Sequence, residues 1–293
     1  MRISTALSPA LALALLAGAC SRGAADHYEY KLQGQIISIA PDHTDATIKH
    51  EDIKGFMSAM TMPYKVKDAK EYENLVPGDL INATLVVVSN NAYLKDVRKV
   101  GNAPLEKPPA EAAMPPASSG FELLKLGQPV PNGKFVNQDG KPTTLEAFRG
   151  SAVLVTFIYT NCPMPTFCPL MDRNFVTIQN KLKADKNALN VHLVTVSFDP
   201  ATDTPPVLKR HAEKLGADTR MWTFLTGDRD DIDQWASRFG VSVSRAMNDP
   251  RDITHNLRTA IIDRQGNLVQ IYTGNDWSPD QALADTRVMV GVD

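Results

Sequence analysis

Residues 152–169 read AVLVTFIYTNCPMPTFCP, and this stretch decides the fold of the larger part of the chain. Its first eight residues are an apolar run of strand length, which predicts a buried strand. A Pro-rich loop containing Cys162 and Cys168 follows, and a helical pattern comes after it. Two thiols in a loop at the end of a central strand can form a disulfide or hold a soft metal ion.

Strand and helix patterns alternate through the remainder of residues 120–293. The expected elements are a hairpin turn at 137–140, a helix at 170–183, a strand at 191–198, a helix from Pro205 to Leu215 capped by Asp203 or Thr204, a helix at 230–239, a hairpin at 257–273 and a helix after Pro279. Alternating strands and helices that end in a hairpin and a helix predict an α/β, thioredoxin-like fold.

Residues 27–101 have a different pattern, with strands alone. Five short strands are expected, at 31–40, 46–50, 55–66, 80–88 and 93–100, with Pro77-Gly78-Asp79 as a turn. Short strands separated by turn signals predict a small β-barrel. The chain is therefore expected to be multidomain, and residues 102–119, which hold five prolines and five alanines, are expected to be the linker.

The N-terminus has the pattern of an export signal. Residues 1–19 contain Arg2, a short apolar core and an ending of small residues before Cys20. Cys20 directly after small residues resembles a bacterial lipobox, which predicts lipidation of Cys20, a membrane anchor and a periplasmic protein. Ordinary cleavage after Ala19 is the alternative, because Ala17 stands where most lipoboxes have Leu.

Composition excludes one class of partner and limits the chemistry. The chain has 293 residues, 43% of them hydrophobic, and a net charge of −2, which suggests no nucleic-acid partner. Only two cysteines remain after Cys20. Disulfides persist outside the cytoplasm, so Cys162 and Cys168 either form one or are kept reduced for a purpose.

Several motifs of residues 120–293 resemble the Sco/SenC family of thioredoxin-fold copper proteins, which help to assemble cytochrome c oxidase. The resemblance rests on FIYTNCP at 157–163, Cys168-Pro169, VSFDP at 196–200, DTP at 203–205 and His255 before the AIID strand at 260–263. It implies that Cys162, Cys168 and His255 bind copper, as Cu(I) and also as Cu(II). Thiolates and an imidazole suit Cu(I), which is a soft ion.

The spacing of the two cysteines departs from the family, which usually has three residues between them. Here there are five, and six positions along a helix would separate the residues by about 9 Å, too far for one metal ion. Pro163, Pro165 and Pro169 predict instead that the loop bulges and brings the sulfurs together.

Simpler roles remain open for each of these residues. The cysteines could form a structural disulfide, and His255 could be a surface or capping residue. Asp199 and Asp203 could orient His255 or the loop, or could be turn and cap residues. Met164 and Met171, near the thiols, are expected to be packing residues.

A second resemblance covers roughly residues 30–100 and is to the CusF-like periplasmic copper-binding domain, an OB-type barrel. It rests on ATIKH at 46–50, AMTMP at 59–63 and VPGD at 76–79. The family ligands, one His and two Met, fall on His50, Met60 and Met62. Met57 stands where the family has a Trp over the copper, and a third thioether could replace that ring. The alternative is that these methionines are barrel core.

Three functions follow from these observations. The first is an exported copper metallochaperone, expected to be a monomer, whose partner is a copper-accepting respiratory oxidase subunit (its CuA site) or another periplasmic copper protein. The second is a thiol–disulfide oxidoreductase, although the usual Cys-x-x-Cys spacing is absent. The third is a binding module for copper storage or tolerance.

Overall fold

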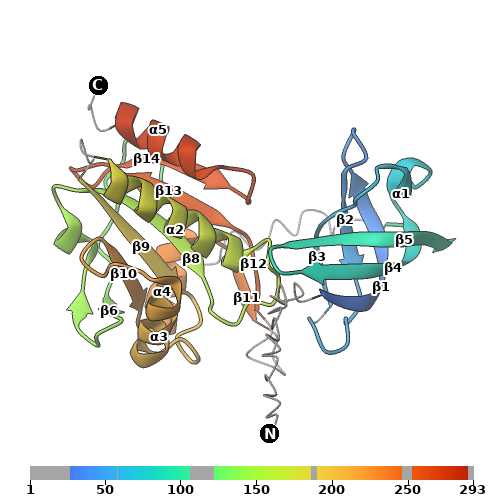
Figure 1. The fold of residues 1–293 in the computed structure, drawn as a ribbon, viewed down its shortest axis with the longest axis horizontal. Helices are drawn as coiled ribbons and strands as arrows, with labels where there is room; N and C mark the ends of the chain where they lie inside the picture. The colour runs from blue at the N-terminus through green and yellow to red at the C-terminus, as the bar shows by residue number, and fades with distance from the viewer. Residues whose placement is uncertain (1–26, 58, 106–121, 186–189, 246–252, 290–293) are drawn as a thin grey trace, which may run out of the picture.

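The computed structural model describes residues 27–57, 59–105, 122–185, 190–245 and 253–289. Two units lie side by side in Figure 1: a sheet built from the first part of the chain, and a larger α/β unit from residue 122 onward. Among the helices in these residues, none is long and apolar enough to cross a membrane.

The first unit is a five-stranded antiparallel sheet with the order β3-β2-β1-β4-β5. Its elements are β1 (His27–Ile39), β2 (Asp45–His50), β3 (Met60–Lys65), helix α1 (Lys70–Glu73), β4 (Asp79–Val88) and β5 (Asn91–Asn102). Val66, directly after β3, bridges to Leu94 of β5, and this contact closes the sheet into a small barrel. Ile36, Ile48 and Leu85 are fully buried inside it.

The second unit contains a seven-stranded sheet with the order β14-β13-β8-β9-β10-β6-β7. Its elements are β6 (Phe135–Asn137), β7 (Pro142–Thr143), the 3-10 helix η1 (Leu145–Phe148), β8 (Ala152–Ile158), α2 (Cys168–Ala184), β9 (Val191–Ser197), α3 (Pro205–Leu215), β10 (Trp222–Thr226), α4 (Arg229–Ser237), β11 (Val243–Arg245), β12 (Ile253–His255), β13 (Arg258–Ile262), β14 (Leu268–Thr273) and α5 (Pro279–Met289).

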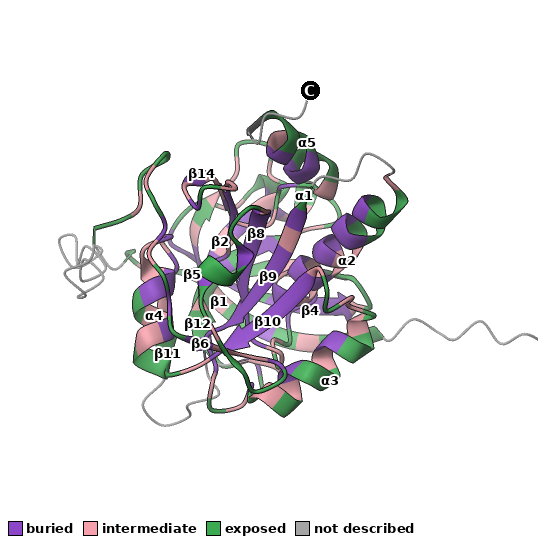
Figure 2. Cartoon of the chain, turned by 90° about the vertical axis from the view of Figure 1, so that its left-hand side faces the viewer, coloured by how far each residue is buried: buried purple, intermediate pink, exposed green. Residues whose placement is uncertain are grey.

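Strand β8 runs through the middle of this sheet, parallel to β9 and antiparallel to β13, and all seven of its residues are buried. Neighbouring residues of a strand point to opposite faces. Thr156 bonds to Thr259, which contacts Met171 of α2, whereas Phe157 packs on Trp235 of α4. Helices α2 and α4 therefore cover opposite faces, which leaves the central strands buried in Figure 2.

The predicted multidomain fold, a small barrel followed by a thioredoxin-like unit, is confirmed, but some elements differ. Strand β10 and the β11–β12 hairpin were not expected. Residues 55–57 were expected to begin a strand, but the extended segment begins only at Met60. Gly55 has a φ of 76°, and Ile53 and Met57 bond to each other across a tight turn.

Several expectations fall on segments that the structure leaves undescribed. The signal segment 1–19 and the lipidation site Cys20 lie outside the described residues, as do residues 106–119 of the expected linker. Strand β5 reaches Asn102, so the first residue of that expected linker belongs to the barrel sheet.

Candidate metal centres

The loop that carries the two cysteines joins the end of β8 to the start of α2. Cys168 is the first residue of the helix, and Pro169 follows it in the first turn, where a missing N–H costs nothing. Two hydrogen bonds close turns within the loop. The Cys162 N–H donates to the Tyr159 carbonyl (3.3 Å), and the Phe167 N–H donates to the Met164 carbonyl (3.0 Å). The loop is therefore not helical, as its prolines predict.

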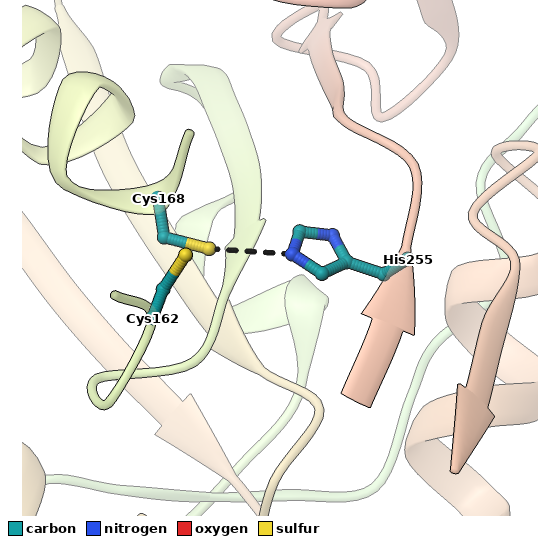
Figure 3. Close-up of side chains that lie close together, drawn as sticks. All are labelled: Cys162, Cys168 and His255. Atoms are coloured by element: carbon teal, nitrogen blue, oxygen red, sulfur yellow. Dashed lines mark hydrogen bonds between the residues drawn. The ribbon is translucent and has the colours of Figure 1, made fainter. Parts of the chain in front are cut away.

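The bulge of this loop brings the two sulfurs next to His255, which ends β12. The ligand atoms of Cys162, Cys168 and His255 all lie within 4.8 Å of one another. The Cys168 Sγ and His255 Nε2 are 3.5 Å apart, the contact dashed in Figure 3. Both cysteines are free thiols. Five intervening residues thus allow the sulfurs to converge from the loop and from the helix start.

The ring of His255 is held so that Nε2 faces the thiols. Its Nδ1 lies 3.0 Å from the carbonyl oxygen of Asn256, and since a carbonyl only accepts, Nδ1 carries the proton and donates it. Nε2 is then the nitrogen with a lone pair, the atom a metal ion needs. Phe198 and Tyr159 pack on the ring at centroid distances of 4.6 and 5.6 Å.

The two thiols differ in their electrostatics. The Cys168 thiol donates a hydrogen bond to Cys162, and this bond holds the pKa of Cys162 well below its ordinary value. Burial raises the pKa of Cys168 well above its ordinary value, and the neighbouring Cys162 sulfur raises it further. Cys162, which is half-buried, is therefore the sulfur that ionises first and that a partner reaches first.

The two aspartates that the sequence places near the site have different positions. The buried Asp203 carboxylate accepts from the Thr160 N–H (2.9 Å) and from the Ser197 hydroxyl (2.5 Å), so it fixes the start of the Cys loop. The carbonyl of Asp199 accepts from the Asp203 N–H. Within the described residues neither aspartate bonds to His255, whose orientation comes from Asn256.

The barrel presents the second group of candidate ligands on adjacent strands. His50 at the end of β2 pairs directly with Met60 of β3, and Met62 lies two residues further along the same face. The Nδ1 of His50 donates to the Glu51 carbonyl at 2.7 Å, which leaves the lone pair on Nε2. Burial lowers the pKa of His50 and keeps the ring neutral.

The second candidate group also contains an unsatisfied polar atom. His50 is 2% exposed, and its Nε2 has no hydrogen-bond partner in the described part of the chain. A buried, unpaired nitrogen is costly unless something binds it. Met57 lies nearby, and its sulfur accepts from the Tyr64 hydroxyl at 3.7 Å, while the Phe56 ring stacks on Tyr30.

Sequence reasoning missed Asn256 as the residue that orients the imidazole and Thr160 as the anchor of the Cys loop. Asn256 follows a predicted ligand directly, which is the only signal that could have pointed to it. Met164 and Met171 were expected to pack, and both are buried, at 4% and 0% exposure.

Comparisons with known proteins agree with both parts of the chain. The family model for SCO1/SenC matches residues 130–291, and the model described as copper-binding periplasmic protein CusF matches residues 29–99. A SCO1 protein homolog of Bacillus subtilis is 30% identical over 155 residues, which cover 52% of this chain and 78% of that protein.

Two solved structures are also similar. A SCO1/SenC family lipoprotein from Bacillus anthracis is 29% identical, with a TM-score of 0.49 over 56% of this chain and 98% of that one. BsSco, described as a member of the Sco family of cytochrome c oxidase assembly proteins, is 27% identical, with a TM-score of 0.49 over 59% and 100%. On the family match over residues 130–291, this chain belongs to the SCO1/SenC family, and it carries a CusF-like domain before that region.

Proposed function

We propose that this protein is a copper metallochaperone that holds Cu(I) between Cys162, Cys168 and His255. One observation carries the proposal: three soft or intermediate donor atoms from distant segments converge within 4.8 Å, and the thiols are not joined in a disulfide. Two thiolates and an imidazole satisfy a low-coordinate Cu(I) ion and leave it open to an acceptor. Cu(II) is a further state that this donor set can hold.

The barrel holds a second Cu(I) ion, bound by His50, Met60 and Met62, with Met57 as an additional thioether. The unpaired Nε2 of His50 and its direct pairing with Met60 support this site. Thioethers carry no proton to lose, so they bind copper under conditions in which protons compete for thiolates. The match to the CusF model, described as copper-binding, agrees with this assignment.

The acceptor in this proposal is the copper site of a respiratory oxidase subunit. Membership of the SCO1/SenC family supports it, because BsSco is described as belonging to a family of cytochrome c oxidase assembly proteins. The protein acts in the periplasm as a monomer, anchored to the membrane by a lipid on Cys20. Labelling of cells with a palmitate analogue would detect that lipid, and its absence from the mature chain would refute the anchor.

A competitive titration tests the two sites. Cu(I) is added anaerobically to the reduced protein in the presence of bicinchoninate, beside the variants Cys162→Ser and Met60→Leu. The parent is expected to bind two equivalents, and each variant to lose one of them. Binding that persists unchanged in Cys162→Ser would refute the thiolate site.

A thiol–disulfide oxidoreductase is the second candidate, and the arrangement of the two sulfurs favours it. Cys162 is half-buried and is the more exposed of the two, whereas Cys168 lies behind it at 1% exposure, as in an attacking and resolving pair. Reduction of an oxidised oxidase fragment by the copper-free protein, with loss in Cys162→Ser, would support this activity. Copper transfer without such reduction would leave the metallochaperone as the only supported function.

A further inference from the structure

Residues from both candidate copper sites line one cavity. This cavity has a volume of about 60 Å³ and lies between the barrel and the α/β unit. Its sulfur- and nitrogen-bearing walls are Met57, Met60 and Met62 from the barrel and Cys162, Met164 and His255 from the other unit. A space of this size holds a metal ion and only a few water molecules.

Met164 is the residue that links the two sides. It belongs to the Cys loop, two residues after Cys162, yet its side chain is 4% exposed and packs into the apolar core of the barrel. The Cys162 thiol lies 3.9 Å from the Met164 carbonyl oxygen. The Met164 side chain therefore lies in the barrel core and lines the same cavity as the barrel methionines, while its backbone stays beside the Cys162 thiol.

The junction around this cavity is held by contacts on the Cys loop itself. The Arg173 guanidinium donates to the Pro165 carbonyl at 2.8 Å and to the carbonyl of Asn90, in the β4–β5 turn of the barrel, at 3.5 Å. The Asn275 side chain donates to the Thr166 carbonyl at 2.8 Å. Both donors to the loop therefore belong to the α/β unit, and Arg173 also links the loop to the barrel at the point where the cavity lies.

We propose that Met164 is a shared thioether ligand that passes Cu(I) between the Met/His site and the Cys/Cys/His site inside this cavity. The proposal rests on the proposed function, namely that both sites bind Cu(I). Neither of the two ligand sets proposed above includes Met164. Met57 is a poorer candidate for this role, because its sulfur already accepts a hydrogen bond from Tyr64.

The step is a ligand exchange without electron transfer. A bond from Cu(I) to Met60 or Met62 breaks as the bond to Met164 forms, and the copper remains Cu(I). The bond to Met164 then gives way to one from the Cys162 sulfur, whose proton is released to water. Neutral thioethers bind Cu(I) but are readily replaced by thiolates, which favours movement toward the cysteines. Because both sites belong to one chain, the copper ion passes between them without diffusing through the solution.

The first experiment isolates the barrel site in the full-length chain. Cys162→Ser and Cys168→Ser remove the thiolates, and Cu(I) affinity is measured by competition with bicinchoninate. Met164→Leu, which keeps the apolar volume, is expected to weaken Cu(I) binding in this background by roughly tenfold. Met171→Leu is the matched control, because that methionine is fully buried in the α/β core and outside the cavity.

The second experiment measures the exchange in the intact chain. Apoprotein is mixed with one equivalent of Cu(I) in acetonitrile, and the ultraviolet absorption of Cu(I)–thiolate bonds is followed by stopped flow. A phase whose rate does not depend on protein concentration is expected, slowed at least tenfold by Met164→Leu and unchanged by Met171→Leu.

The outcomes separate this inference from the proposed function. Equal affinities and equal rates for Met164→Leu and Met171→Leu, with two equivalents still bound by the parent, would overturn the role of Met164 and leave the chaperone intact. Absence of Cu(I) binding in the parent would overturn both. Urea midpoints of the two variants, measured beside the parent, show whether either effect comes from a loss of folding.

Discussion

Removal of the Asp203 carboxylate is expected to destabilise the α/β unit and disturb its copper site together. Asp203 is fully buried and accepts three hydrogen bonds, from the Thr160 N–H, the Thr160 hydroxyl and the Ser197 hydroxyl. These bonds tie the residue at the start of the Cys loop to the end of β9. The substitution Asp203→Ala leaves the donors without an acceptor in a site from which water is excluded.

The size of the effect follows from the donors that lose their partner. Thr160 is only half-buried, so its hydroxyl can turn to water and is not counted. The Thr160 N–H and the Ser197 O–H each cost about 1–3 kcal/mol when left without a partner, so the loss is about 4 kcal/mol. With a urea dependence of about 2 kcal/mol per molar, the unfolding midpoint falls by roughly 2 M. Asp203→Asn keeps one oxygen as an acceptor, and its midpoint is expected to fall by about half as much.

During the urea titration, tryptophan emission reports the unfolding of the α/β unit alone. The chain has three tryptophans, Trp222, Trp235 and Trp277, and all of them lie in the α/β part. Cu(I) affinity of the thiolate site should fall in Asp203→Ala, while the barrel site keeps its own. A midpoint within about 0.3 M of the parent would refute the reasoning that Asp203 clamps the loop.

Three further predictions use other parts of the chain. Burial lowers the pKa of His192 to about 4, so its neutral form stabilises the fold above pH 6.5, and this stability is lost as pH falls toward 4. The free energy of unfolding, measured by urea titration, should be lower by about 2–3 kcal/mol at pH 4.5 because of this residue. A His192→Gln variant with the same acid dependence as the parent would contradict this prediction. Iodoacetamide at pH 7 should alkylate Cys162 at least tenfold faster than Cys168 in the copper-free protein, because Cys162 has the lowered pKa and the greater exposure. Mass spectrometry of the peptides measures the two alkylation rates. Comparable rates would argue against Cys162 as the thiol that ionises first. Gly34→Ala would place a Cβ 2.7 Å from the Ile48 side chain, in the strand that ends at the candidate ligand His50, and should cost about 1–3 kcal/mol. It should lower Cu(I) affinity in the barrel only, and calorimetry showing an unshifted barrel transition would exclude the clash.

Local patterns predicted most of the fold. The apolar run at 152–158, the proline-led helix at 205–215 and the hairpin at 258–273 lie where their sequences place them, because each is specified by neighbours along the chain. The missed elements depend on distant partners. Strand β10 has only five residues and is stabilised by pairing with β9 and β6, and the turn at Gly55 depends on a positive φ that composition does not reveal.

The sequence by itself also determined which side chains are candidate ligands, since Cys162, Cys168, His50 and the barrel methionines stand in recognisable local motifs. Only the tertiary structure decided how they meet. It brings His255 to the thiols across 87 residues, points its Nε2 inward through Asn256, and places Met164 against the barrel. These contacts arise from packing between segments far apart in the chain, and periodicity along a sequence carries no information about such distances.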